Sequence, residues 1–580
     1  MAAVPDEKHD TTALGTHHEE VYTDKSTEEE EVNGPVVIEE EDDFEWSAGV
    51  LTNLVALLWC YFCSTWGLVV PNSAIGFITE QFPEGASKAA WIAAAVTIPN
   101  CVIQAFIGDL SDVLGRRIFL QAGCVLGAVG MIIASRGNSI EMVIGGQVLN
   151  GVGLTLGFLA VPLVAEIVPR DARAQTTGAA AMFAGIASSL GPIVQGAFIS
   201  RNVGGHEHGW RTGFYLGAGF YGIGLILVTF FYRPGPRPNP EGLSVSQRLL
   251  RFDWIGIFLA TAGLTIFLVG LQYGGHQYGW SSGLVLSCLI LGAVCMGAFV
   301  LWEWKFTSTG IFSHELFGHP NYATCLVLSA VGGIVLFGGQ AYLPQEIIAL
   351  FTNDAILTGV YNLPFNLMSV VGAVGGAIVM RAMCEGKWVV VASFIFLTVG
   401  GGLMAVMEPN INYAAWFFPS ALLGVAVGIQ MAILVTITSL ASPDHLIAAA
   451  VSTNSSIRAL GGSIGVVIFG QIFQSKLKIK LPEAVSKAAI ASGLGQDEIS
   501  KFLQSFEHAS QEVLMEIPGV TQEVILAARS AGEQAYADSY RFIWYSLIPF
   551  AVLALSLAFL LKPVREQLTR QVASRVQNAH

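Results

Sequence analysis

Long apolar stretches recur along almost the whole of this 580-residue chain and decide what it can fold into. A helix needs roughly 20 mostly apolar residues to cross the hydrocarbon core of a bilayer. Fourteen stretches of about this length predict an integral membrane protein built of helices. They are 49–71, 89–108, 118–135, 140–164, 178–200, 212–232, 254–273, 282–302, 323–343, 356–379, 388–407, 412–438, 446–473 and 541–561.

The composition excludes a soluble globular protein. Hydrophobic residues make up 53% of the chain, charged residues only 12%, and the mean hydropathy is +0.59. A soluble chain carries about 25% charged residues. The eight cysteines fall mostly within apolar runs, where they are typical of small buried hydrophobes rather than of a disulfide framework.

The net charge of −14 comes from one segment. Residues 1–46 hold 16 acidic and two basic side chains, so the rest of the chain is neutral. A neutral body excludes a basic nucleic-acid-binding surface, and no nucleic-acid partner is expected. The segment has no apolar core of a secretory signal and too little apolar surface to fold. It is predicted to be a disordered tail kept solvated by its charge, with partner binding as the alternative.

Basic side chains in the short loops predict which way the chain crosses the membrane. If the N-terminus is cytosolic, the loops and tail on that side collect fifteen Lys and Arg, and the short loops opposite collect four. Cytosolic loops of membrane proteins are enriched in these residues. An even number of spans returns the chain to its starting side, so both termini are expected in the cytosol.

The long segment 475–540 is then expected outside, because long loops cross largely regardless of charge. Within it, Ile499, Phe502, Leu503 and Phe506 repeat at helical spacing after two acidic residues. This pattern predicts a short amphipathic helix on the outer surface. A helical cap and a separate binding domain are the two interpretations.

The connection between the second and third spans carries the most specific pattern, Gly-Asp-Leu-Ser-Asp-Val-Leu-Gly-Arg-Arg at 108–117. Gly108 and Gly115 allow a tight turn with close helix approach. Asp112 can cap a helix or pair with a cation, and Arg116 and Arg117 hold the loop at the inner surface. At every fixed position the segment resembles the signature loop of the major facilitator superfamily, G-x-L-x-D-x-x-G-R-R/K.

Further segments resemble the fourteen-span drug:proton antiporter branch of that superfamily. Gly191-Pro192 with Gly196 in span 5 resembles the antiporter motif G-P-x-x-G-G, although Gln195 replaces one glycine. Ordinary close packing of small residues is the alternative interpretation. Residues 253–256 and 458–465 also resemble segments of this branch. The runs 165–169 and 535–545 are similar to the fungal trichothecene-efflux-pump family, to which the siderophore-iron transporters are related.

This resemblance implies an all-α membrane protein with the major facilitator fold, its 14 transmembrane helices arranged as 6+2+6. It implies a fungal plasma-membrane protein that is a monomer, with a vacuolar or vesicular membrane as the alternative location. The predicted parts are the tail 1–46, a six-helix bundle at 47–232, two additional spans with a linker at 233–305, a second six-helix bundle at 306–561 that includes the outer loop 475–540, and a cytosolic tail at 562–580.

Two departures concern proton coupling. Gln147 stands where the antiporter motif R-x-x-Q-G of span 4 has its Arg, a residue linked to coupling in the family. The aspartate-bearing motif of span 1 is absent, and Val-Val-Pro-Asn occupies 69–72. These departures argue against the family's usual route of coupling.

The energy for transport is expected to come from a gradient. The sequence contains no G-x-x-x-x-G-K-[ST] nucleotide motif and no H-E-x-x-H zinc motif, so no cofactor, metal or enzyme activity is expected. Protons and a small-molecule substrate, with membrane lipid around the protein, are the expected partners. Charged groups within spans are costly and mark such pathways. The candidates are Glu166, Asp253, Glu346 and Arg458.

Arg458 lies deepest, inside span 13, where an isolated Arg costs at least about 2.5 kcal/mol. It is either a cation for substrate or coupling, or a buried group bonded to carbonyls or to neighbours such as Gln430. Glu166 and Asp253 are shallower, so that they either pair with nearby arginines as gates or carry protons. These arginines are Arg170, Arg173 and Arg251.

A midplane cavity for an amphipathic compound needs apolar walls and a few polar groups. Trp91 and Phe337 are expected walls. Each polar candidate is either a ligand contact or an interhelical hydrogen-bond partner. The candidates are Asn100, Gln104, Gln195, Gln340, Tyr342, Asn362, Asn366 and Gln430.

Three functions follow from these observations and the resemblance. The first is proton-coupled export of a small organic compound, such as a fungal toxin, secondary metabolite or drug, by alternating access. The second is siderophore-iron uptake by proton symport, since a long outer cap would suit a bulky cargo. The third is a non-transporting sensor that signals through the acidic tail.

Overall fold

The computed structural model describes residues 46–82, 88, 90–205, 209–235, 244–275, 278–307, 314–352, 354–409, 411–506, 514–515 and 517–567. Except for Trp46, the predicted acidic tail lies outside these residues, as do residues 568–580 of the predicted C-terminal tail. The described part of the chain contains no β-strand, only one isolated bridge between Gly274 and Tyr278.

Helices account for the fold from the first described residues to the last. The N-terminal half contains α1 (Ala48–Ser73), α2 (Ile75–Gln81), α3 (Ala90–Leu114), α4 (Arg116–Ser135), α5 (Ile140–Phe158), α6 (Ala160–Glu166), α7 (Arg173–Ser200), α8 (Gly209–Phe230), α9 (Val245–Leu250), α10 (Trp254–Tyr273) and α11 (Gly283–Lys305). The C-terminal half contains α12 (Pro320–Leu350), α13 (Ala355–Tyr361), α14 (Leu363–Met383), α15 (Lys387–Met404), α16 (Tyr413–Leu440), α17 (Ile447–Ala491), α18 (Ile499–Phe506) and α20 (Gln522–Ala558), with short 3-10 turns at His314–Gly318, Asp444–Leu446, Gln496–Glu498 and Arg565–Gln567.

Fourteen of the described helical segments are long and apolar enough to cross a membrane, which confirms the predicted number of spans. Two spans are interrupted, since α5 with α6 forms the fourth and α13 with α14 forms the tenth. Polar side chains start several of these helices. Ser47 and Ser139 each accept a hydrogen bond from a backbone N–H three residues later, which satisfies a donor that the first turn leaves free.

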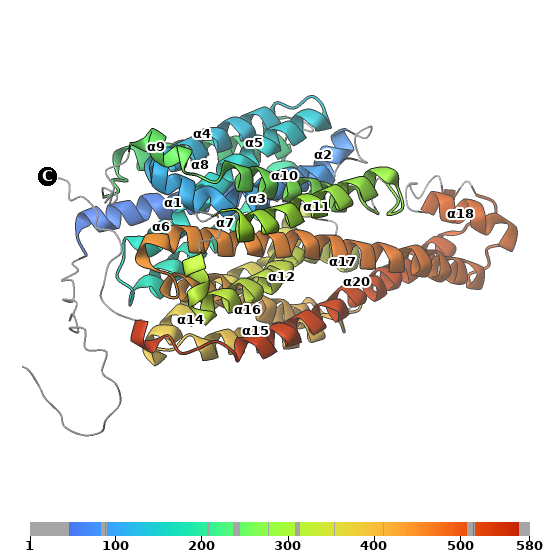
Figure 1. The fold of residues 1–580 in the computed structure, drawn as a ribbon. Helices are drawn as coiled ribbons and strands as arrows, with labels where there is room; N and C mark the ends of the chain where they lie inside the picture. The colour runs from blue at the N-terminus through green and yellow to red at the C-terminus, as the bar shows by residue number, and fades with distance from the viewer. Residues whose placement is uncertain are drawn as a thin grey trace, which may run out of the picture. The chain divides into compact units, whose positions relative to one another are not determined.

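Six spans pack together as the N-terminal bundle: α1, α3, α4, α5 with α6, α7 and α8. Glycines set the distance between some of its helices, because a Cβ at Gly130 or Gly146 would overlap the backbone of the neighbouring helix. The other six, α12, α13 with α14, α15, α16, α17 and α20, form the C-terminal bundle around large buried side chains such as Phe394, Trp416 and Trp544. Figure 1 shows both groups of helices.

The two bundles meet along α3 with α17 and along α7 with α14. At the first seam the Ser456 hydroxyl donates to the carbonyl of Cys101 over 2.7 Å. At the second, a Cβ at Gly178 would lie 3.1 Å from that of Ala377. These close contacts leave the helices on both sides of the seams in position to enclose a common space.

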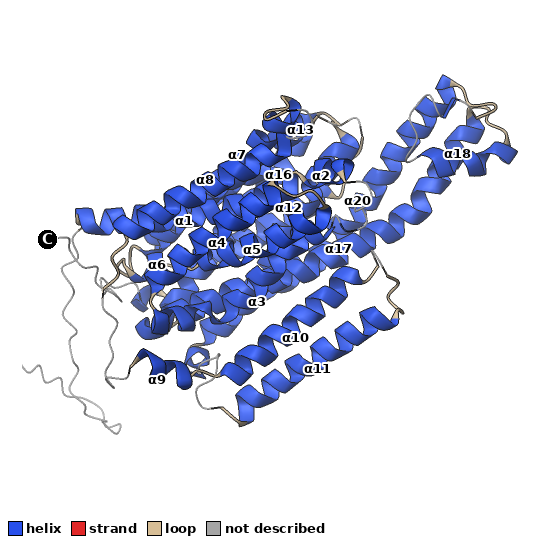
Figure 2. Cartoon of the chain, turned by 90° about the horizontal axis from the view of Figure 1, so that it is seen from above, coloured by secondary structure: helices blue, strands red, loops and turns tan. Residues whose placement is uncertain are grey.

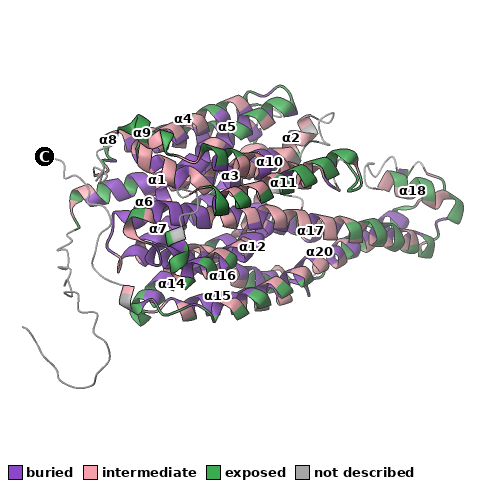
Figure 3. Cartoon of the chain, viewed as in Figure 1, coloured by how far each residue is buried: buried purple, intermediate pink, exposed green. Residues whose placement is uncertain are grey.

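The two additional spans belong to neither bundle, and one of them packs on the outside of both. Helix α10 packs against α3, α17 and α11, and Figure 2 shows α10 and α11 side by side next to α3. Only 11% of the most apolar stretch of α11 is buried, against 78% in α1, and Figure 3 shows the same contrast. Apolar surface of this extent needs a lipid environment, as expected for a membrane span.

The predicted outer loop 475–540 is largely helical. Helix α17 continues to Ala491, beyond residue 473, and α20 begins at Gln522, before residue 541. Leu481, Val485 and Ala489 recur every four residues on α17 and pack in one cluster with residues of α20 and with Phe502 of α18. This shared apolar core explains why helix persists in a lysine-rich stretch. The short helix predicted here is confirmed as α18, and Figure 1 shows it near the end of α17 and the start of α20.

Candidate functional site

A cavity lies between the two bundles and is lined by both. Its walls come from α1, α3, α5, α6 and α7 on one side and from α12, α14, α16 and α17 on the other. It holds about 970 Å³ of space between atoms, counting any part continuous with solvent. All but one of its lining residues are apolar or carry an uncharged hydroxyl or amide group. This composition suits a small organic molecule.

Several side chains that the sequence marked as candidates line this cavity. The signal for them was a polar residue within an otherwise apolar span. The structure brings them together from α3, α12, α14 and α17. They are Asn100, Gln104, Gln340, Asn366 and Arg458, together with the expected wall residue Phe337.

Two other candidates connect helices within one bundle and do not line the cavity. The side-chain amide of Gln195 on α7 donates to the carbonyl of Trp210 on α8 over 2.9 Å. The Tyr342 hydroxyl on α12 donates to the carbonyl of Val466 on α17 over 3.0 Å. Both side chains therefore serve as interhelical partners, which was the alternative interpretation.

The remaining candidates also lie outside the cavity lining. Asn362 sits at the junction of α13 and α14, where it ends the first helix and precedes the second. Gln430 is buried against Gly332, and neither its side-chain oxygen nor its nitrogen has a hydrogen-bond partner among the described residues. The expected wall residue Trp91 packs instead on Tyr273 of α10, with ring centroids 4.8 Å apart. Each helix is rotated so that these side chains do not face the cavity, and the composition of a helix does not reveal its rotation.

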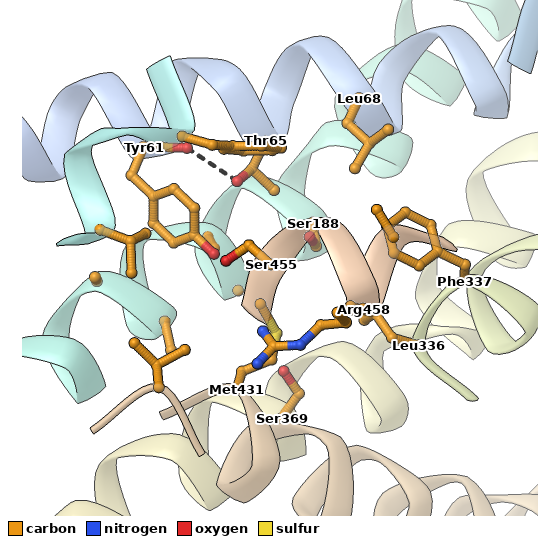
Figure 4. Close-up of a pocket in the computed structure, with 18 of the residues that line it drawn as sticks. Tyr61, Thr65, Leu68, Ser188, Leu336, Phe337, Ser369, Met431, Ser455 and Arg458 are labelled. Atoms are coloured by element: carbon orange, nitrogen blue, oxygen red, sulfur yellow. Dashed lines mark hydrogen bonds between the residues drawn. The ribbon is translucent and has the colours of Figure 1, made fainter. Parts of the chain in front are cut away.

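Sequence reasoning missed the hydroxyl groups of the cavity. Figure 4 shows the hydroxyl of Tyr61 pointing toward that of Ser455, with Thr65, Ser188 and Ser369 around the same space. Serine and threonine are common in membrane helices because they bond to their own backbone, as Thr65 does with the carbonyl of Tyr61 over 2.9 Å. The sequence did contain one signal for them, since Tyr61 and Thr65 stand four residues apart in span 1 and therefore share one face of that helix.

Arg458 is the one charged side chain among the described residues that line the cavity. It is 8% exposed, and its Nη2 atom has no hydrogen-bond partner in the described part of the chain. No acidic side chain of the described ranges lies within ion-pair distance of it, and Gln430 makes no bond to it. Of the two interpretations of Arg458, the buried bond to Gln430 is therefore not what the structure contains.

Glycines fix the position of Arg458 at the α12–α17 contact. A Cβ at Gly333 of α12 would overlap the carbonyl of Arg458, and one at Gly461 of α17 would overlap the carbonyl of Ala330. The backbones can touch only because both positions lack a side chain. The pattern Arg-Ala-Leu-Gly-Gly at 458–462 thus anchors the backbone of Arg458 where α12 and α17 touch. Beside it, Gly462 packs on the ring of Phe337.

The signature segment forms a network of charges where α3 joins α4, which we call the motif end of the bundles. Gly115 adopts a φ of 104°, a left-handed conformation that favours glycine. Asp112 accepts from Arg116 over 3.2 Å, and Arg116 also forms an ion pair with Glu166. Arg117 donates to the carbonyl of Thr229 on α8. Glu166 was expected to pair with Arg170, Arg173 or Arg251, and its ion pair is instead with Arg116.

A second set of charges joins the bundles at the same end. Asp444, between α16 and α17, lies 2.8 Å from Arg170 and 3.3 Å from Arg173. Arg173 is fully buried and also donates to the carbonyl of Ser439 over 3.1 Å. We call these two ion pairs the latch. Gly108 strengthens the closure, because a Cβ there would lie 2.6 Å from the carbonyl oxygen of Ala448. The motif end is therefore closed.

Asp253 has a local structural partner. It caps the start of α10 by accepting from the N–H of Gly256 over 2.8 Å. Its carboxylate also accepts from the Trp302 indole at 2.9 and 3.1 Å, which ties α10 to α11. The motif 253–256 thus positions the additional spans rather than the cavity.

Glu346 is buried in the C-terminal bundle, 1% exposed, and lies outside the cavity lining. Its carboxylate accepts a hydrogen bond of 3.0 Å from the Trp544 indole of α20. The partner is neutral, unlike the arginine that faces Glu166. Glu346 is therefore a buried acid that can hold a proton without breaking an ion pair.

The antiporter-like segment of α7 serves packing within the N-terminal bundle. A Cβ at Gly191 would lie 3.2 Å from Val70 and 3.9 Å from Trp66 of α1. Pro192 lies inside the helix and Gly196 is buried. Small residues and a proline here let α7 approach α1 closely and bend.

No group of three or more His, Cys, Asp or Glu residues in the described ranges could hold a metal ion. Cys60 and Cys63 have the spacing of a Cys-x-x-Cys motif, and both are free thiols buried in α1. Two further residues of a metal-binding type, His206 and His208, lie outside the described residues.

Comparisons with known proteins agree with this architecture. The family model of the Major Facilitator Superfamily matches residues 57–466, more than half of the chain. The chain is 26% identical over 462 residues to "MFS transporter L2" of Phoma sp., covering 79% of this chain and 73% of that one. It is 26% identical over 433 residues to "MFS-type efflux transporter pyiT" of Pyricularia grisea, covering 74% and 70%.

A solved structure shares the arrangement of the helices. The proton:xylose symporter XylE, bound to 6-bromo-6-deoxy-D-glucose, matches with a TM-score of 0.57 at 11% identity. The match covers 90% of this chain and 98% of that one. At this identity the likeness shows the fold alone.

Proposed function

The chain belongs to the major facilitator superfamily, and from that premise we propose that it exports small organic compounds, driven by the proton gradient. The cavity lined by both bundles carries this proposal. A solute held there contacts helices of both bundles, so rocking one bundle against the other exposes it first to one side and then to the other. The direction is supported by the relative that is named an efflux transporter.

The closed motif end defines one state of this cycle. To open it, the latch between Asp444 and the two arginines must break, and Gly108 must separate from Ala448. The Arg116–Glu166 ion pair lies within the N-terminal bundle and can stay intact during the movement. In this mechanism the latch is the gate, and the signature network keeps its own bundle rigid.

Glu346 is the group that we propose to carry the proton. It is buried, and Trp544 offers a hydrogen bond to the carboxylate without a counter-charge. Protonation therefore removes the cost of burying an unpaired negative charge. In this proposal Glu346 takes over the coupling role that the resemblance assigns to an Arg in span 4, where this chain has Gln147.

Finer features complete the proposal. We place the chain in the fourteen-span drug:proton antiporter branch, close to the trichothecene-efflux-pump family, as a monomer in the plasma membrane. Both termini are proposed to face the cytosol, so the motif end is the inner end and the α17–α20 extension is an outer cap. Tags on the two ends test this orientation, since labels on opposite faces would contradict it.

Transport by the purified full-length protein in liposomes tests the function. We expect an imposed proton gradient to drive movement of apolar organic compounds against their own gradient, and dissipation of the proton gradient to stop it. A ferric hydroxamate siderophore supplied in the same assay tests the uptake alternative. Movement of the siderophore alone would contradict export of organic compounds, and movement of no compound would contradict a transporter of either kind.

A further inference from the structure

The buried positive charge of Arg458 has no counter-charge among the described residues, and this determines which substrates suit the cavity. We propose that the cavity selects organic anions, compounds with an apolar skeleton and one carboxylate or comparably acidic group that pairs with Arg458. The inference rests on the proposed function and specifies its substrate class. It comes from the contrast between the charges of the cavity and those of the motif end.

The two buried arginines of the motif end, Arg116 and Arg173, both have acidic partners. Arg116 pairs with Asp112 and Glu166, and the two arginines of the latch share Asp444. Arg458 is 8% exposed, yet no acidic side chain of the described part of the chain lies within ion-pair distance. An uncompensated charge buried in a membrane protein is costly, and a bound anion that pairs with it offsets part of that cost.

The surroundings of Arg458 keep its charge in the cavity. The side chain starts where α17 touches α12 at Gly333, so the backbone cannot move to carry it toward a polar headgroup. Figure 4 shows the guanidinium within the cavity, on the side of Met431 and Ser369. A guanidinium remains charged at any physiological pH and presents a planar fork that matches a carboxylate.

The rest of the lining suits the other parts of such a substrate. Ser369 and the amide of Asn366 can donate hydrogen bonds to an anionic group near Arg458. Leu336, Phe337 and Met431 offer apolar surface to a carbon skeleton. No Asp or Glu belongs to the described lining, so an organic cation would meet a repelling charge without any attracting one.

The experiment uses three dansyl compounds that share one fluorophore and differ in charge. Dansylglycine carries a carboxylate, dansylglycinamide is neutral, and dansylethylenediamine provides a cation. Their proton-driven transport is measured in liposomes that contain the full-length protein. For the wild type we expect the carboxylate to be preferred over the amide by about tenfold or more, because charge-assisted hydrogen bonds are the stronger ones.

Three variants locate the source of the preference. Arg458→Gln should move the carboxylate and the amide equally well, and Arg458→Lys should keep part of the preference because it keeps the charge. Arg201→Gln, a matched change at an exposed arginine after α7, should behave like the wild type. Amide transport by Arg458→Gln shows at the same time that this variant is folded.

The outcomes separate the two proposals. If wild type and Arg458→Gln share the same carboxylate preference, or if both lack one, the charge assignment is overturned while export stands. If the wild type moves none of the three compounds, the result counts against the proposed function itself. If Arg458→Gln loses transport of the carboxylate and the amide alike, Arg458 has a structural role and the selectivity proposal is overturned.

Discussion

The motif end and the central cavity treat buried charge in opposite ways. At the motif end, Arg116 and Arg173 are almost fully buried, and each faces acidic side chains. In the cavity, Arg458 is buried to a similar degree and faces hydroxyls, amides and apolar groups. Paired charges hold helices together, whereas an unpaired charge is a cost that the fold bears for another reason. The difference separates structural from ligand-directed arginines.

The largest loss of stability is expected from breaking the signature network. Arg116→Gln leaves Asp112 and Glu166 without their shared cation, and Glu166 is 2% exposed. Removing one partner of a buried pair costs about 3–5 kcal/mol. The free energy of unfolding, measured by detergent-induced unfolding in mixed micelles, should fall by this amount.

The double variant Arg116→Gln with Glu166→Gln is the control for that loss. It also removes the buried acidic charge that the single variant deprives of Arg116, so it should recover part of the stability. A single variant as stable as the wild type would show that the network contributes nothing, and the contrast with the cavity would disappear.

A smaller effect is expected at the latch, where the change should appear in conformation as well as in stability. Asp444 is 34% exposed and its bonds cross from one bundle to the other. Asp444→Asn should weaken the closed motif end by about 1.5–3 kcal/mol, the usual contribution of hydrogen bonds to charged groups. Spin labels on the exposed Cys384 and on Ile118→Cys, one on each bundle, should report a larger share of long distances.

Gly108→Ala provides an independent test of the same closure. Its added Cβ would press on the backbone at Ala448 without altering any charge. Both variants should shift the label distances in the same direction. If neither does, the contacts at the motif end are not what keeps it closed.

The sequence predicted the number of spans and a role for Asp112 and Arg116 because both depend on local patterns, but it did not predict that Arg116 pairs with Glu166. Hydropathy alone gives fourteen spans, and the fixed positions of 108–117 brought Asp112 and Arg116 to attention. The acidic residue of the latch, Asp444, was not predicted because it stands in a short turn between α16 and α17. Only the packing of α7 against α16 brings Arg173 to it, and such a distant contact leaves no pattern in the sequence.

The cavity was predicted only in part, for a reason that its amides illustrate. Gln104 and Gln195 look alike in sequence, each a polar residue in an apolar helix. Gln104 lines the cavity, whereas Gln195 bonds to the carbonyl of Trp210. Which way a helix face turns depends on glycine contacts between specific helices, such as Gly333 with Arg458, and these appear only in the assembled fold.

Glu346 is a third kind of buried charge, whose one hydrogen-bond partner within the described ranges is the neutral indole of Trp544. Glu346→Gln should change the free energy of unfolding by less than about 1 kcal/mol, because the amide oxygen can still accept from the Trp544 indole. Proton-driven accumulation should be lost, while exchange of substrate down its own gradient should continue. Accumulation at the wild-type level would exclude Glu346 as the proton carrier.

The smallest loss of stability is expected at Arg458, because its charge faces no acidic side chain in the described ranges. Loss of a paired arginine exposes its partner's charge, but Arg458 has no such partner in the described ranges, so Arg458→Gln removes a cost and leaves none behind. Its unfolding free energy should therefore lie within about 1 kcal/mol of the wild type or above it. Addition of dansylglycine should stabilise the wild type and not the variant, because only the wild type binds the anion through Arg458. A loss as large as that of Arg116→Gln would mean that Arg458 holds helices together, and the distinction between the two regions would fail.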